Sequence, residues 1–181
     1  MITIILQVIA IVLAIKCLSM VNKHDIPTAA KFLDKFMKIM MVVLIIGYII
    51  GFISEFKTIY ETEILAIIFV IKSLIEMFFI ILIGYYSINL LKNLALDKIY
   101  DRTNPETLVN ISKSFIYYAL TSVVGGLVMT TISFLSKNLK LGFFISTSFF
   151  IFILLGVIFY VLSLLFERSI DIYEENQLTI W

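Results

Sequence analysis

Apolar residues fall into five long runs separated by short polar segments. The runs cover residues 2–21, 39–53, 64–91, 116–135 and 141–166. A helix needs about 20 apolar residues to cross a hydrocarbon layer of about 30 Å. Inside lipid, a helix is the structure that satisfies every backbone polar group within one segment. The pattern therefore predicts an all-α, polytopic transmembrane helix bundle of five spans. It forms a single membrane domain over residues 1–181 that ends in a polar tail at 167–181.

Two of the polar connections also carry helix signals. Residues 22–38 place apolar side chains at helical spacing, with Pro27 suited to a first turn. This segment is expected to be an amphipathic helix that runs into the second span. Before the fourth span, Thr103 or Asn104 precedes Pro105, a typical helix start. That helix is expected to continue into the span without a break.

The composition supports a membrane protein and argues against several chemistries. Of the 181 residues, 61% are hydrophobic and 15% charged, whereas soluble domains are usually about 45–50% apolar. One cysteine, Cys17, argues against an internal disulfide or a Cys-based zinc cluster, and one histidine, His24, against a histidine metal site. No cofactor or metal is expected. A net charge of +1 gives no sign of direct nucleic-acid binding. No H-E-x-x-H, paired intramembrane aspartates or serine–histidine set is visible, so the chain is expected not to be an enzyme.

The basic residues predict which side each connection faces. The connections at 22–38 and 92–113, together with the tail, hold nine Lys and Arg residues. The connections at 54–63 and 136–140 hold three. Connections rich in Lys and Arg stay in the cytoplasm. The N-terminus is therefore expected outside and the tail in the cytoplasm.

The third span contains both a cation and an anion, Lys72 and Glu76. The two lie four residues apart and share one helix face. Glu76 is expected near the middle of the bilayer, about 15 Å from the outer end of the span. A lone charge there costs at least about 2.5–3.5 kcal/mol. Two interpretations remain open: a ligand, ion or proton site facing the bundle interior, or a structural pair held by a hydroxyl on another span.

Glycines in two spans suggest helix packing. Gly47 and Gly51 form a G-x-x-x-G that lets two helix backbones approach closely. Gly125 and Gly126 in the fourth span predict a kink or a close helix contact. The alternative is that membrane helices simply tolerate glycine at these positions.

The tail is a candidate binding segment for a partner protein. Arg168 and several acidic residues put a helical turn or two into water, and residues 178–180 then look like a short extended segment. Such a segment can add to a sheet edge or fill a groove of another protein. The alternative is a solvated C-terminus. The candidate partner-binding residues are Glu175, Asn176, Leu178, Thr179 and Ile180.

Two stretches carry a family resemblance. Ser169–Ile180, SIDIYEENQLTI, resembles the ending AIDIxxENDLTI/V that is typical of the bacterial DUF2975 membrane proteins, and departs from it at Gln177. The connection between the third and fourth spans, from Leu90 to Leu120, loosely resembles that of the same family. The resemblance covers about residues 36–180. Members look like four-span proteins, so the resemblance implies that the first span is an addition.

The resemblance implies a function without enzyme activity. Genes of this family often lie beside one for a small helix-turn-helix protein of the Cro/C1 type. The leading hypothesis is a sensor or tether in the bacterial cytoplasmic membrane that controls such a regulator. It would respond to an envelope signal or a peptide ligand, and the chain could also form a homo-oligomer. Alternatives are an immunity or transporter-accessory protein against a membrane-active peptide, or a small carrier or channel that uses Lys72 and Glu76.

Overall fold

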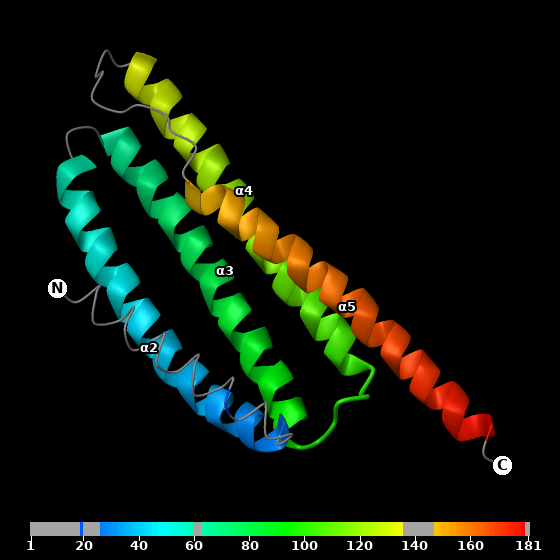
Figure 1. Ribbon diagram of the computed structural model, residues 1–181. Helices are drawn as coiled ribbons and strands as arrows, with labels where there is room; N and C mark the ends of the chain where they lie inside the picture. The colour runs from blue at the N-terminus through cyan, green and yellow to red at the C-terminus, as the bar shows by residue number, and fades with distance from the viewer. Residues whose placement is uncertain (1–18, 20–25, 60–62, 136–146, 180–181) are drawn as a thin grey trace.

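The computed structural model describes residue 19 and residues 26–59, 63–135 and 147–179. The last three ranges contain four long helices (Figure 1). The helices are α2 (Ile26–Ile59), α3 (Glu63–Ala95), α4 (Thr103–Leu135) and α5 (Thr147–Thr179). These described residues contain no strand. The predicted first span at 2–21 lies outside them, apart from Ser19, and so does the start of the predicted fifth span.

Each helix is longer than a bilayer requires. The helices have 33 or 34 residues, which corresponds to about 50 Å at 1.5 Å per residue. All four are long and apolar enough to cross a membrane. The hydrocarbon core is only about 30 Å thick, so each helix extends beyond it. The amphipathic segment after Pro27 is continuous with the second predicted span, as expected.

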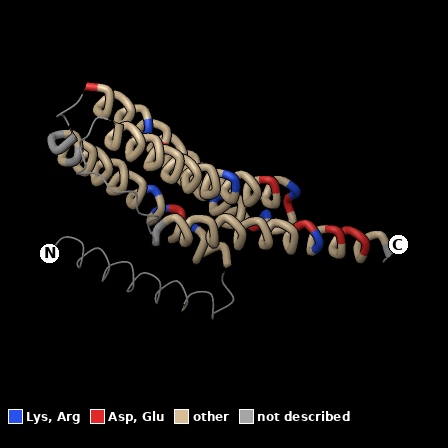
Figure 2. The backbone as a smooth tube through the Cα atoms, turned by 90° about the horizontal axis from the view of Figure 1, so that it is seen from above, with Lys and Arg blue, Asp and Glu red and all other residues tan. Residues whose placement is uncertain are grey.

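The extra length lies mainly at one end of the helices. α2 and α4 begin there and α3 and α5 end there, and most of the charged residues lie at this end (Figures 1 and 2). It is called the charged end below. It comprises residues 26–38 of α2, the segment 92–113 and residues 167–179 of α5.

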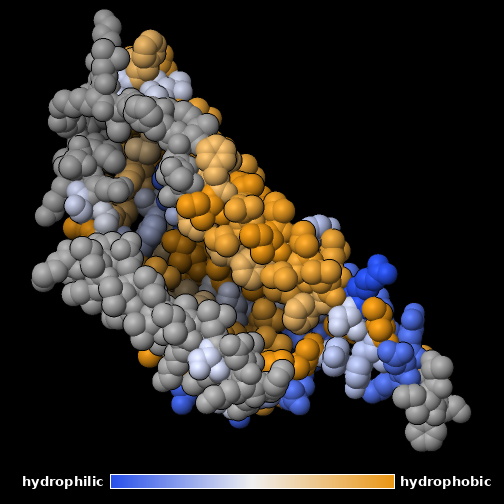
Figure 3. All heavy atoms as spheres, viewed as in Figure 1, coloured by the Kyte–Doolittle hydropathy of each residue, from blue (hydrophilic) through white to orange (hydrophobic). Residues whose placement is uncertain are grey.

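The four helices form an open row rather than a closed ring. Each packs against its neighbour in sequence, and within the described part of the chain α2 contacts only α3. A small apolar cluster forms between α2, α3 and α4 around Leu65, Phe69 and Met129, with Phe52 packed against it. Apolar residues cover much of the surface of α4 and α5 that is visible in Figure 3. Such a surface fits lipid as its solvent.

Close contacts between helices occur at three glycines, and only one of these glycines was predicted to pack. A Cβ at Gly84 would collide with Met41 of α2, and one at Gly156 would lie 2.7 Å from Ile116 Cγ1 of α4. Neither glycine was predicted from its sequence context. At Gly125, where a kink or a close helix contact was predicted, a Cβ would lie 2.6 Å from Lys72 Cδ of α3.

The other predicted glycines behave differently. No described atom lies within 4 Å of a Cβ built on Gly47 or Gly51. The predicted G-x-x-x-G seam is therefore wrong for contacts among the described helices, and both glycines line a cavity instead. Gly126 lies on the same helix as Gly125, and its carbonyl accepts a hydrogen bond from Thr130 Oγ1.

The turn between α3 and α4 is closed by local hydrogen bonds. The amides of Asp97 and Lys98 donate to the carbonyls of Leu94 and Asn93. Asp97 takes the left-handed conformation, with φ 59°, so the helix ends in a Schellman motif. α4 begins at Thr103, close to the predicted start. The capping oxygen comes from Asp101, which accepts from the Thr103 amide at 2.9 Å, and not from Thr103 or Asn104.

Helix α5 continues through most of the predicted tail. Leu178 and Thr179 are helical, so the predicted extended conformation is wrong for them, and Ile180 lies outside the described residues. The helix of the apolar run continues without a break through Leu178 and Thr179. Ile170 is only 1% exposed, which shows that α5 still packs against the bundle beyond its apolar run.

Candidate functional site

A cavity of about 380 Å³ lies among the four helices near the middle of their apolar segments. Gly47 and Gly51 of α2 line one side of it, and Phe149 and Phe152 of α5 line another. The polar side chains that line it come from α2, α3 and α4. They are Tyr48, Lys72, Ser73, Glu76, Tyr118 and Ser122.

Lys72 and Glu76 form an ion pair in this cavity. Lys72 Nζ lies 2.8 Å from Glu76 Oε1, and Glu76 is only 6% exposed. The Tyr48 hydroxyl of α2 donates toward two acceptors, the Ser73 carbonyl at 3.0 Å and Glu76 Oε2 at 3.2 Å. Because one hydroxyl carries one proton, these two bonds are shared.

The pair is incompletely hydrogen-bonded. Glu76 Oε1 accepts no hydrogen bond from a described residue, although the lysine ammonium faces it. The structural interpretation expected a hydroxyl from another span, and Tyr48 supplies one. Sequence reasoning did not single out Tyr48, whose only signal was a polar group within an apolar run. The unused capacity of Oε1 is compatible with the ligand-site interpretation as well, because Glu76 is one of the residues that line the cavity.

The Lys72 side chain also packs against helix α4. Its aliphatic stem packs against Gly125 of α4. Lys72 also lines a groove of about 440 Å³ between α3 and α4, whose other walls include Ile75, Phe79 and Val124. Lys72 therefore lies at the boundary between a polar cavity and an apolar groove. Its stem is buried on apolar surface while its ammonium reaches the carboxylate, as long basic side chains do at such boundaries.

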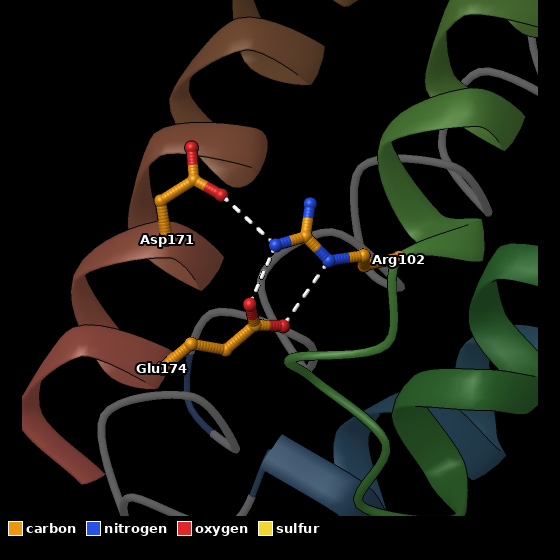
Figure 4. A network of polar contacts seen from close by, with 3 residues as sticks. All are labelled: Arg102, Asp171 and Glu174. Atoms are coloured by element: carbon orange, nitrogen blue, oxygen red, sulfur yellow. Dashed lines mark hydrogen bonds and ion pairs between the residues drawn. The ribbon is translucent and has the colours of Figure 1, made fainter. Parts of the chain in front are cut away.

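A second polar cluster holds α5 at the charged end (Figure 4). Arg102, in the turn before α4, binds Glu174 through Nε at 3.1 Å and through Nη2 at 2.5 Å. Nη2 also lies 3.2 Å from Asp171 Oδ1. Beside it, the rings of Tyr100 and Tyr173 stack with centroids 4.1 Å apart. These four contacts, called the clasp below, join the α3–α4 turn to α5.

The electrostatics of the clasp follow from its geometry. Hydrogen bonds from Arg102 lower the pKa of Glu174 below its ordinary value of 4.5. The same bonds raise the pKa of Arg102. Both residues are exposed, so solvent screens the pair and its contribution to stability is small. The clasp is therefore a weak, readily reversible contact.

The predicted tail residues lie close to the clasp and far along α5 from the cavity. Asn176 and Leu178 are exposed, and Leu178 is 80% exposed. Glu175 and Thr179 lie on the same helix. The structure thus separates the predicted residues into two groups, one in the membrane segment and one at the charged end. Within the described part of the chain, no cluster of His, Cys, Asp and Glu could hold a metal ion.

Four long apolar helices around a buried ion pair define the chain as a multi-pass helical membrane protein. The chain belongs to a family described as proteins of unknown function, DUF2975, whose model matches residues 52–180. The resemblance noted in the sequence is confirmed, although the match begins near Phe52 and not near residue 36. The search of curated proteins gave no match. The search of solved structures gave none either.

Proposed function

We propose that this protein is a non-enzymatic sensor or tether that controls a cytoplasmic partner, such as a helix-turn-helix transcription regulator. It would lie in the bacterial cytoplasmic membrane with five spans, including residues 2–21, its N-terminus outside and its tail inside. The observation that carries the proposal is the continuity of α5. One unbroken helix runs from the wall of the cavity at Phe149 to the exposed end near Leu178.

Continuity matters because a helix transmits displacement along its axis. Phe149 and Phe152 border the cavity, so an occupant that displaces them would shift α5 against α4, on which it packs closely at Gly156. At the far end, only exposed contacts hold the helix to the α3–α4 turn. A ligand shifts a two-state equilibrium by its difference in affinity for the two states. Because the clasp is weak, a small difference in ligand affinity between the two states is enough to open it.

The charge distribution supports the proposed orientation. The connections at the charged end hold most of the Lys and Arg residues, and such connections stay in the cytoplasm. The exposed end of α5 would then face cytoplasmic proteins. Reporter fusions after Leu135 and after Thr179 test this: we expect an externally active reporter only at the first site. The reverse result would refute the orientation.

Affinity co-purification from the native host tests the proposed function. The full chain is compared with a chain that ends at Glu174, which keeps the clasp but lacks the exposed tip. We expect a DNA-binding protein to be recovered with the full chain and lost with the shorter one. A Leu178→Ser variant should weaken recovery, whereas Tyr85→Phe, far from the tip, should not. Recovery of no partner by either chain would refute the proposal.

The cavity favours one other candidate function, a small carrier or channel that uses Lys72 and Glu76. Its support is the buried ion pair beside an open volume. Purified protein in liposomes should then show ion- or proton-linked flux that Glu76→Gln abolishes. Absence of flux from folded protein would eliminate this candidate.

A further inference from the structure

We propose that the cavity between α2, α3, α4 and α5 binds a small zwitterion with an apolar body, whose carboxylate pairs with Lys72 and whose ammonium pairs with Glu76. The ligand class is that of an α-amino acid with a large apolar side chain. Binding is a property of the cavity alone, so it does not depend on the proposed regulatory role of the tail.

Charge balance selects a zwitterion. Lys72 and Glu76 together carry no net charge, and Glu76 is buried. A cationic or anionic ligand would leave one uncompensated charge in a poorly solvated site, which is strongly unfavourable. A zwitterion adds two opposite charges and leaves the sum at zero. It can therefore lie beside the pair without either residue changing its protonation.

Hydrogen-bonding capacity points to the same chemistry. Glu76 Oε1 is buried and has no hydrogen-bond donor among the described residues. Because Glu76 lines the cavity, a rotation of its carboxylate would let this oxygen accept from a ligand ammonium. The lysine ammonium has three N–H donors, and its only contact with a described polar group is with that same oxygen. The two charged atoms are 2.8 Å apart, a separation similar to that between the ammonium and carboxylate of an α-amino acid. The ligand and the pair can thus align as two opposed dipoles.

The rest of the cavity fits an apolar body. Phe52, Phe69, Phe149 and Phe152 line it, and the rings of Phe52 and Phe69 stack with centroids 5.5 Å apart. Aromatic walls favour an aromatic or aliphatic side chain and attract a nearby ammonium. A volume of about 380 Å³ lies in the ordinary range for small-ligand sites, about 300–1,000 Å³.

Three probes with the same side chain and different charge test the inference. They are L-phenylalanine, its methyl ester and N-acetyl-L-phenylalanine, which at about pH 6 are a zwitterion, a cation and an anion. Binding to the full chain in lipid nanodiscs is measured by isothermal titration. We expect the zwitterion to bind at least about tenfold more tightly than either charged probe, a difference of about 1.4 kcal/mol.

Charge variants make the test specific. Glu76→Gln leaves a net positive cavity and should shift the preference to the anion. Lys72→Met leaves a net negative cavity and should shift it to the cation. The double variant retains a neutral cavity and should lose discrimination between the probes. Thermal unfolding of each variant establishes that it is folded. If a single variant does not fold, the loss of discrimination in the double variant still tests the proposal.

Two controls separate the cavity from other surfaces. Gly51→Leu fills the cavity and should abolish binding, whereas Tyr85→Phe, which lies outside it, should leave binding unchanged. A chain ending at Glu174 should bind as the full chain does, so loss of partner recovery and loss of ligand binding are distinguishable. Best binding of the methyl ester to the unmodified chain, preferences that ignore the charge variants, or no binding of any probe to folded protein would each overturn the proposal.

Discussion

Lys72 and Gly125 touch across the interface between α3 and α4. A Cβ at position 125 would lie 2.6 Å from Cδ and 2.8 Å from Cγ of the lysine. The absence of a side chain at Gly125 therefore lets the lysine stem lie flat against α4 while its ammonium reaches Glu76. The position of the intramembrane ion pair depends on a residue of a neighbouring helix that carries no charge.

This relationship gives the first prediction. Gly125→Ala must displace the lysine stem, and overpacking of this kind costs about 1–3 kcal/mol. In a Lys72→Ala, Glu76→Gln background the stem is absent, so the same substitution should cost less than about 0.5 kcal/mol. Thermal unfolding of the full chain in detergent measures both values as a double-mutant cycle. Equal losses in the two backgrounds would show that the lysine is not what Gly125 accommodates.

A second prediction concerns the contact between α4 and α5. A Cβ on Gly156 would meet Ile116 Cγ1 at 2.7 Å and the Ser112 carbonyl oxygen at 3.2 Å, and Ser112 Oγ donates to the Gly156 carbonyl at 2.7 Å. Because backbone atoms yield little, Gly156→Ala should destabilise the protein by about 1–3 kcal/mol.

The matched control for that change is Gly51→Ala, since no described atom lies near its Cβ position. It should be neutral or stabilise the helix by up to about 1 kcal/mol, because alanine restricts the unfolded chain more than glycine does. Thermal unfolding of the two variants side by side is the measurement. A comparable loss from both would mean that glycine at position 156 is not required by packing.

The clasp provides a third prediction, which depends on pH. Arg102→Gln should increase amide hydrogen exchange in residues 171–179 several-fold at neutral pH, because α5 loses three of the four clasp contacts and keeps only the Tyr100–Tyr173 stack. The Glu174 pKa is lowered in the folded protein, so the contribution of the pair is present above pH 4.5 and lost as the pH falls through that lowered value. The difference between variant and unmodified protein should therefore disappear in strong acid, after correction for intrinsic exchange rates.

Arg168→Gln is the charge-matched control for the clasp. Arg168 lies on the same helix and forms no ion pair with a described residue. It should leave exchange in the last turns of α5 unchanged. If both variants loosen α5 equally, the effect comes from net charge and not from the geometry of Arg102.

The fourth prediction concerns Asn104, which is fully buried. Its amide donates to the carbonyls of Lys98 at 2.7 Å and Ile99 at 3.0 Å and accepts from Asn93. Asn104→Ala removes these three hydrogen bonds from a fully buried position and should cost about 1–3 kcal/mol. The exposed Asn176→Ala should stay within about 0.5 kcal/mol. Unfolding measurements, with limited proteolysis of the turn at 96–102, would reveal the difference, and a neutral Asn104→Ala would contradict it.

The helices were predictable because lipid leaves an apolar chain few alternatives. Runs of apolar residues such as 64–91 must satisfy their backbone groups internally, and the spacing of Lys72 and Glu76 then places the two on one face. Their ion pair follows from local sequence, and α3 includes both residues.

The contacts between helices were not predictable in the same way. Tyr48 reaches Glu76 from 28 residues away, and Arg102 reaches Glu174 from 72. Such pairs depend on how each helix is rotated about its axis. A helix that is apolar on all sides, as α3 is over most of its length, gives no periodic signal for that rotation. For the same reason, the G-x-x-x-G at Gly47 indicated a seam but not what would lie beside it.

The row-like arrangement, in which each described helix packs on its neighbour in sequence, has a consequence for biosynthesis. As the chain leaves the ribosome, α3 finds α2 already present, α4 finds α3, and α5 finds α4. Contacts that are local in sequence form quickly. Among the described helices, each one after α2 can therefore pack on a neighbour that has already been translated. The cavity forms last, when α5 supplies Phe149 and Phe152 as its final wall.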